Sequence, residues 1–196
     1  MSETIVEPTP SVFVLVAGKE REINFGDYTN VTVRLQSEGD LLIGSSEFFN
    51  KYLQQASSYD LCVFMNDGSN FVDNAFTEIV ETAFEKGIFG GVYTDNVIVD
   101  DKGNTLYHKQ YPSYDARLAF NKFIYNAPLF VKPSMLRPFD QKLSFLNMWD
   151  AFFTYCRMSM LYHIPKPIVS MIKTDDYSSD ITKEFKAIND KIQTTQ

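Results

Sequence analysis

Acidic and amide side chains follow several strand-like segments of this sequence, and these residues could do chemistry. Asn66 and Asp67 come directly after one apolar run, Thr94 and Asp95 close another, and Asp150 lies at the start of an aromatic helical segment. Ligands of open α/β sheets bind outside the carboxyl ends of the strands. We therefore expect these side chains at one edge of a sheet, together with an acidic pair that follows the last predicted strand, Asp175 and Asp176.

Oxygen ligands at such an edge would suit a hard divalent cation that neutralises a phosphate-bearing ligand. Each residue also has a purely structural interpretation. Asp67 can cap a turn or the next helix, and Asp95 can be an ordinary residue at a strand end. An Asp in the first turn of a helix complements the helix dipole, which is the alternative for Asp150. Trp149 shares helical spacing with neighbouring aromatic residues, which favours core packing over stacking on a sugar: Phe152, Phe153 and Tyr155.

The segments that position these residues alternate between strand and helix. Short apolar runs bounded by turn residues predict buried strands, and apolar residues at helical spacing predict amphipathic helices. The alternation predicts a single α/β domain whose sheet is mixed but mostly parallel, with helices on both faces. The expected strands are 11–17, 31–35, 60–65, 88–95, 127–131 and 168–172, with a hairpin joining 97–99 to 105–107; the expected helices are 42–57, 73–86, 115–123, 146–162 and 181–196.

Length and composition support one folded domain. The chain has 196 residues, of which 44% are hydrophobic and 15% aromatic, so it can fill a sizeable core. We expect a flexible arm over residues 1–10, the domain over 11–180, and a C-terminal helix or tail over 181–196. The formal net charge of −7 argues against a broad nucleic-acid surface. It leaves room for a small site that binds an anion through local donors.

The cysteines and the N-terminus predict a cytoplasmic location. Cys62 and Cys156 lie in apolar segments without metal-like neighbours, which indicates buried free thiols in a reducing compartment. The first ten residues have neither a basic nor an apolar leader region, and no apolar run reaches the length of a membrane span. The sequence also lacks a P-loop, a G-x-G-x-x-G fingerprint, a Ser-His-Asp order and a zinc-like Cys/His spacing.

The order of the segments resembles that of a family 2 glycosyltransferase, whose nucleotide-sugar-binding fold is called GT-A. The closest match is GVYTDNVIVDDKG at 91–103, which is similar to that family's "v-Y-s/t-D … i-D-x-x-G" segment. The likeness covers most of residues 11–180. Its other parts are QSEG at 36–39 with the helix through Asn50, DLCVFMNDGS at 60–69, NAPLFVKPSM at 126–135, Phe139-Asp140, MWDAFFTYCR at 148–157 and IPKPIVS at 164–170.

The resemblance implies roles for the residues that match. Asp67, alone or with Asn66, would hold Mn²⁺ or Mg²⁺ against the diphosphate of a sugar nucleotide. Asp150 would be the general base that deprotonates the acceptor hydroxyl, and the metal would stabilise the departing diphosphate. The substrate-binding residues would be Asp95, Thr94 and Trp149.

The sequence also departs from the family pattern. The metal-binding D-x-D position reads Asn66-Asp67-Gly68, so at least one carboxylate is missing, and the family's early nucleotide-binding strand has no clear counterpart. The residues before the expected base, Asn147-Met148, are one position out of step with the family's "E-D". The stretch at 64–74 also fits the family's nucleotide-binding strand, and in that register Asp67 contacts base or ribose instead of metal.

Two functions follow as hypotheses. The first is a small glycosyltransferase-like enzyme that transfers a sugar from a nucleotide-sugar donor to an unknown acceptor. The alternative is a catalytically degenerate GT-A-like domain that acts as a binding or structural module in a larger assembly, with a protein partner or a second copy of the chain.

Overall fold

The computed structural model describes residues 9–18, 22–36, 45–87, 89–112, 127–143, 146–158, 161–173 and 179–193, and the structural statements below concern these residues. They form a single α/β domain. Its strands are β1 (Val12–Val16), β2 (Val31–Leu35), β3 (Leu61–Met65), β4 (Ser69–Phe71), β5 (Gly91–Val99), β6 (Thr105–Lys109), β7 (Leu129–Val131) and β8 (Leu161–Ile172); its helices are α1 (Ser45–Ala56), α2 (Ala75–Glu85), α3 (Asn147–Met158) and α4 (Ser179–Gln193), with a 3-10 turn at Pro133–Met135.

The strands make one mixed sheet. Their order is β2-β1-β3-β7-β5-β8-β4, with β6 paired to β5 alongside this path. Parallel pairing joins β1 to β2, β1 to β3, and β5 to β8. The short strand β7 is antiparallel to both β3 and β5, so it links two parallel groups. The prediction of a mixed sheet is confirmed, and β1, β2, β3, β5 and β8 share one direction.

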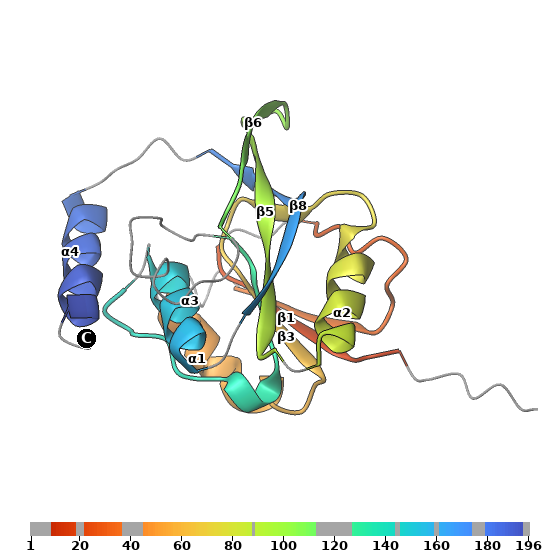
Figure 1. Cartoon of the computed structure of the whole chain (residues 1–196), viewed down its shortest axis with the longest axis horizontal. Helices are drawn as coiled ribbons and strands as arrows, with labels where there is room; N and C mark the ends of the chain where they lie inside the picture. Colours follow the sequence, from red (N-terminus) through yellow and green to blue (C-terminus); the bar gives the residue numbers. More distant parts are fainter. Residues whose placement is uncertain are drawn as a thin grey trace, which may run out of the picture.

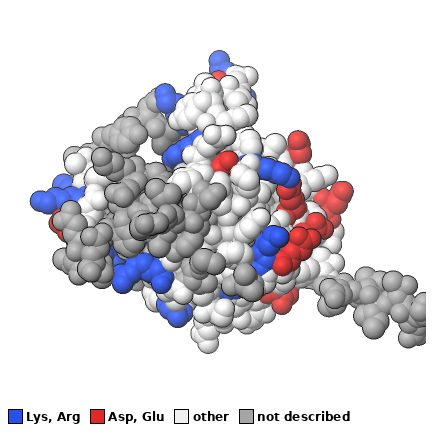
Figure 2. All heavy atoms as spheres, in the orientation of Figure 1, with Lys and Arg blue, Asp and Glu red and all other residues white. Residues whose placement is uncertain are grey.

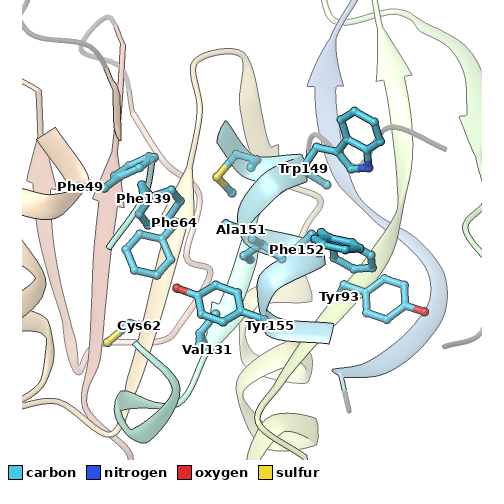
Figure 3. Packing of buried hydrophobic residues seen from close by; sticks show 14 of the residues in the cluster. Phe49, Cys62, Phe64, Tyr93, Val131, Phe139, Trp149, Ala151, Phe152 and Tyr155 are labelled. Atoms are coloured by element: carbon cyan, nitrogen blue, oxygen red, sulfur yellow. The ribbon is translucent and has the colours of Figure 1, made fainter. Parts of the chain in front are cut away.

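Helices cover both faces of the sheet, as predicted (Figure 1). On one face α2 packs through Phe76, Ile79 and Val80. On the other face α1 and α3 pack over an aromatic core. Figure 3 shows Phe49, Phe64 and Phe139 together in this core, with ring centroids 4.9 to 5.4 Å apart.

Continuous apolar runs explain why the first half of the chain was predicted well. All five residues of β1 and of β3 are buried, as expected for strands covered on both faces. The expected strands 11–17, 31–35 and 60–65 and the expected helices 42–57 and 73–86 agree with the structure to within a few residues; residues 42–44 of the first helix lie outside the described part. The predicted helix at 115–123 also lies outside it.

The structure corrects the prediction at three places. The polar stretch Asn66–Asn70, where no strand was predicted, contains the first residues of β4, which pairs with β8. The strand expected over 88–95 and the one over 97–99 are a single strand, β5. The helix expected to reach Tyr162 ends at Met158, and Leu161 and Tyr162 begin β8. The apolar pattern continues across this boundary, so periodicity could not locate it.

Both cysteines are free and buried, as predicted. Burial raises the pKa of the Cys62 thiol to about 12 and that of Cys156 to about 12, which keeps both protonated at neutral pH. None of the described helices has both the length and the apolar character needed to span a lipid bilayer.

Candidate functional site

The carboxyl ends of β1 and β3 lie side by side, at the position where open α/β sheets usually bind their ligands. The chain leaves β1 for β2 on one side, and it leaves β3 toward the opposite side of the sheet. Such a reversal between neighbouring parallel strands is the usual ligand position in this class of fold. Asp67 is exposed just beyond β3 at this position, and its Oδ1 accepts the Gly68 N–H at 2.9 Å.

Gly18, just after β1, allows Asp67 to approach the end of its neighbouring strand. A Cβ atom on Gly18 would lie 2.4 Å from the Asp67 Cβ, and Gly18 has a φ of +112°, which side chains rarely adopt. The Gly18 N–H donates to Oε1 of Gln36, which follows β2, at 2.8 Å. The ends of three neighbouring strands are therefore tied together around Asp67.

Asn66 connects this edge to the start of α3. Its Nδ2 donates to Oδ1 of Asn147 at 3.2 Å, and Nδ2 of Asn147 donates to the Ser45 hydroxyl at the start of α1 at 2.8 Å. Asn147 is only 1% exposed. The structure therefore brings Asn66 together with the first turn of α3, the turn that also carries Trp149 and Asp150.

Trp149 and Asp150 are both covered by α4. The Trp149 ring stacks on Phe185 with centroids 5.3 Å apart and planes at 22°. The Asp150 carboxylate accepts from Lys191 Nζ at 2.6 Å, and its side chain is 6% exposed. Figure 3 shows the Trp149 ring directed away from the core residues, whereas Phe152, on the same helix, points toward Tyr93. Trp149, which is 4% exposed, thus packs against Phe185 of α4.

Thr94 and Asp95 lie inside the sheet near its junction with β8. Oδ1 of Asp95 accepts the Tyr111 N–H at 2.8 Å and lies 2.8 Å from His163 Nε2. The His163 ring stacks on Tyr93 at 4.7 Å, and Thr94 is fully buried. Asp95 is 3% exposed, so its bonds are with the protein itself.

Of the predicted acidic residues that the structure describes, Asp67 is exposed, whereas Asp95 and Asp150 are buried. We call the first position open and the other two enclosed. In the part of the chain that the structure describes, no three Asp, Glu, His or Cys side chains are grouped to hold a metal ion. Asp175 and Asp176 lie outside that part. Figure 2 shows acidic side chains gathered on the side where α2 lies, where Glu78, Glu81 and Glu85 belong to its partly or fully exposed positions.

Sequence reasoning missed three residues of this region. His163 was not among the predicted site residues, because its pairing with Asp95 depends on where β8 begins. Asn147 was noted only as a departure from a family pattern, although it joins Asn66 to α1. Nothing in the residues around Gln36 indicated a role at the site. The parallel pairing of β1 with β2 brings it to Gly18.

Comparisons with known proteins identify no family for this chain. No protein-family model matches it, and no curated protein matches it. Among the solved structures, A197 from STIV is similar to this chain, with 10% identity over 79% of this chain and 82% of that chain and a TM-score of 0.43. A likeness at this level carries no argument about fold or function.

Proposed function

We propose that this protein binds a nucleotide sugar at the carboxyl edge of β1 and β3 and transfers the sugar to an acceptor hydroxyl. The observation that carries the proposal is the arrangement at the ends of these strands: Asp67 lies against Gly18, and Asn66 is hydrogen-bonded to Asn147 in the first turn of α3. The ordered resemblance to family 2 glycosyltransferases, and with it a GT-A-like fold, supports the same proposal.

Asp67 is the residue that we assign to the diphosphate end of the donor. One exposed carboxylate is a small donor set, but Mg²⁺ is commonly bound by one or two carboxylates plus substrate phosphates. We therefore expect Mn²⁺ or Mg²⁺ to bind with the sugar nucleotide and not alone, held by Asp67 with the Asn66 carbonyl. When bound, the metal would neutralise charge on the diphosphate.

Asp150 is the proposed general base. In the transfer, the acceptor oxygen forms a bond to the sugar C1, and the bond from C1 to the diphosphate oxygen breaks. The acceptor proton passes to the Asp150 carboxylate, and the electron pair of the broken bond stays on the diphosphate. Thr94, Asp95 and Trp149 can contact substrate only in a conformation that opens them, because each is at most 4% exposed here.

A thermal-shift panel of UDP- and GDP-sugars, with and without Mn²⁺, tests the binding step. Donor at about 100 times its dissociation constant should add roughly 2.7 kcal/mol of stability. For a chain of this size that corresponds to a rise in Tm of roughly 5–10 °C. Asp67→Ala should abolish the Mn²⁺-dependent shift. Asp101→Ala, in the exposed turn between β5 and β6, is the matched control and should keep it. No shift with any donor at millimolar concentration would refute the proposal.

A binding or structural module is the second candidate. It is favoured by the enclosure of Asp95 and Asp150, and by exposed apolar residues on β6, where Leu106 is 47% and Tyr107 52% exposed. Such residues are common at protein interfaces. Sedimentation velocity across a concentration series tests this candidate on the unmodified chain. A strictly monomeric protein that still binds a sugar nucleotide would count against it.

A further inference from the structure

The helix α4 covers the part of α3 that the proposed transfer needs. It lies beside α3 on the outside of the domain, away from the sheet (Figure 1). Its contacts with Trp149 and Asp150 are a ring stack from Phe185 and an ion pair from Lys191. The family resemblance implies that Trp149 binds substrate and that Asp150 is the general base, so one helix covers both residues.

A third contact fixes α4 at the amino end of α3. The backbone N–H of Leu146, one residue before the helix, donates to Oε2 of Glu184 at 2.8 Å. Ile188, between Phe185 and Lys191 on α4, is 1% exposed and belongs to the same core cluster as Trp149. The contacts thus extend over almost two turns of α4, and they define a specific docked position.

The docked position is held by side chains that are still partly in water. Phe185 is 40% exposed, and the Lys191 side chain is 44% exposed. Among the α4 side chains that the structure describes, Ile188 is the buried one. By contrast, α3 has nine buried residues. A segment with few buried contacts opens locally before the core does, so α4 can leave while α3 stays folded.

We propose that α4 is an autoinhibitory cover: while docked, it blocks the face of Trp149 and the carboxylate of Asp150 from an acceptor, and its displacement opens the transfer site. This inference rests on the proposed function, in which Asp150 takes the acceptor proton. Donor binding at Asp67 lies at the strand ends and does not require α4 to move. The two proposals therefore have separate readouts.

The double variant Phe185→Ala/Lys191→Ala in the full chain tests the cover. Trp149 is the only tryptophan of the chain, so its fluorescence reports directly on α4 docking. The unmodified protein should show blue-shifted emission that acrylamide quenches poorly. The double variant should show red-shifted, readily quenched emission with unchanged far-ultraviolet circular dichroism. Lys186→Ala, at an exposed position of the same helix, is the matched control and should behave like the unmodified protein.

Release of nucleoside diphosphate from the donor, with water as acceptor, measures the consequence. For the donor that binds, the double variant should hydrolyse it at least several-fold faster than the unmodified protein, with an unchanged dissociation constant. An equal rate with Trp149 exposed would overturn the cover and leave donor binding intact. Absence of donor binding in both proteins would overturn the proposed function, and with it the inhibitory role.

Hydrogen exchange on the unmodified protein provides a second test that needs no variant. Amides of α4 should exchange through local opening, faster than those of α3 and β1. Exchange of α4 only through global unfolding would show that the helix is a permanent part of the core. That result would overturn the proposal even if the double variant failed to fold.

Discussion

The two sides of the candidate site differ in what their polar side chains already bind. At the ends of β1 and β3, Asp67 is exposed, and its carboxylate accepts the N–H of the next residue, Gly68. On the side of β5 and α3, Asp95 and Asp150 are each enclosed with a basic partner from elsewhere in the chain, His163 and Lys191. Residue type was the same at all three positions, so the strand ends alone do not decide which carboxylate is available.

The difference follows from what packs above each strand. The parallel pairing of β1 with β2 and β3 leaves their carboxyl ends at one edge, where Asp67 reaches solvent. On the other side β8 runs alongside β5 through twelve residues and α4 packs on α3, and both supply partners for buried acids. Asp67 on the first side is therefore exposed, whereas Asp95 and Asp150 on the second side are buried.

Replacing an Asp by Ala on each side gives the largest expected contrast. Asp95→Ala removes the acceptor of two buried groups, the Tyr111 N–H and the His163 ring, and should cost about 2–3 kcal/mol of unfolding free energy. Asp67→Ala should cost less than about 1 kcal/mol, because Asp67 is exposed. Urea unfolding of both variants measures the contrast. Equal costs would contradict the distinction between an open side and an enclosed side.

A double-mutant cycle ties the larger cost to the buried pair. His163→Ala should be less destabilising in the Asp95→Ala background than in the unmodified chain, because the partner is already missing. Additive costs would mean that the two side chains do not stabilise each other, and would move the explanation to the Tyr111 N–H.

Gly18→Ala should damage the open side through its backbone. The added Cβ would lie 2.4 Å from the Asp67 Cβ, and an alanine at a φ of +112° is strained, so we expect a loss of about 2 kcal/mol and of donor binding. Chemical denaturation and the thermal-shift panel measure the two effects. Gly18→Ala/Asp67→Gly relieves the clash but keeps the strained φ, and it should recover only part of the stability. Full recovery would assign the whole cost to the clash.

The ends of β1 and β3 could be predicted from the sequence because local patterns determine where these strands end. The β1 and β3 runs are apolar throughout and are followed by Gly18 and by Asn66-Asp67-Gly68. A buried parallel strand with a polar turn after it needs no distant information to be identified. Asp67 was therefore placed at a strand end in either register of the family resemblance, and its placement there is confirmed.

The enclosed side depends on pairings between distant segments. The register of β8 against β5 shifts around Asp95, which pairs with Pro167 just after Thr94 pairs with Ile164. Proline is compatible with a strand at such an irregularity. However, no local sequence pattern predicts the register shift or the position of His163 next to Asp95. Likewise, α4 was predicted as a helix, but the sequence did not predict that it packs on α3 and contacts Trp149.

The smallest expected effect concerns the amino ends of the same open strands and depends on pH. Oδ2 of Asp60, just before β3, accepts from the backbone N–H and the hydroxyl of Ser11, just before β1, at 2.8 and 2.7 Å. The bond from the Ser11 backbone, followed by that from its hydroxyl, holds the Asp60 pKa below its ordinary value of 3.8. Because Asp60 is exposed, we expect Asp60→Asn to cost only about 0.5–1 kcal/mol at pH 7.

Hydrogen bonds that favour the ionised form stabilise the folded state fully above the ordinary pKa, and this stabilisation is lost as pH falls through the lower pKa of the folded protein. The difference in unfolding free energy between Asp60→Asn and the unmodified chain should therefore be constant from pH 7 to pH 5 and shrink below pH 3.8. Urea unfolding at pH 7, 5 and 3.5 measures it. A difference that persisted unchanged at the lowest pH would show that the carboxylate charge contributes nothing, and that Ser11 and Asp60 join β1 to β3 through neutral hydrogen bonds alone.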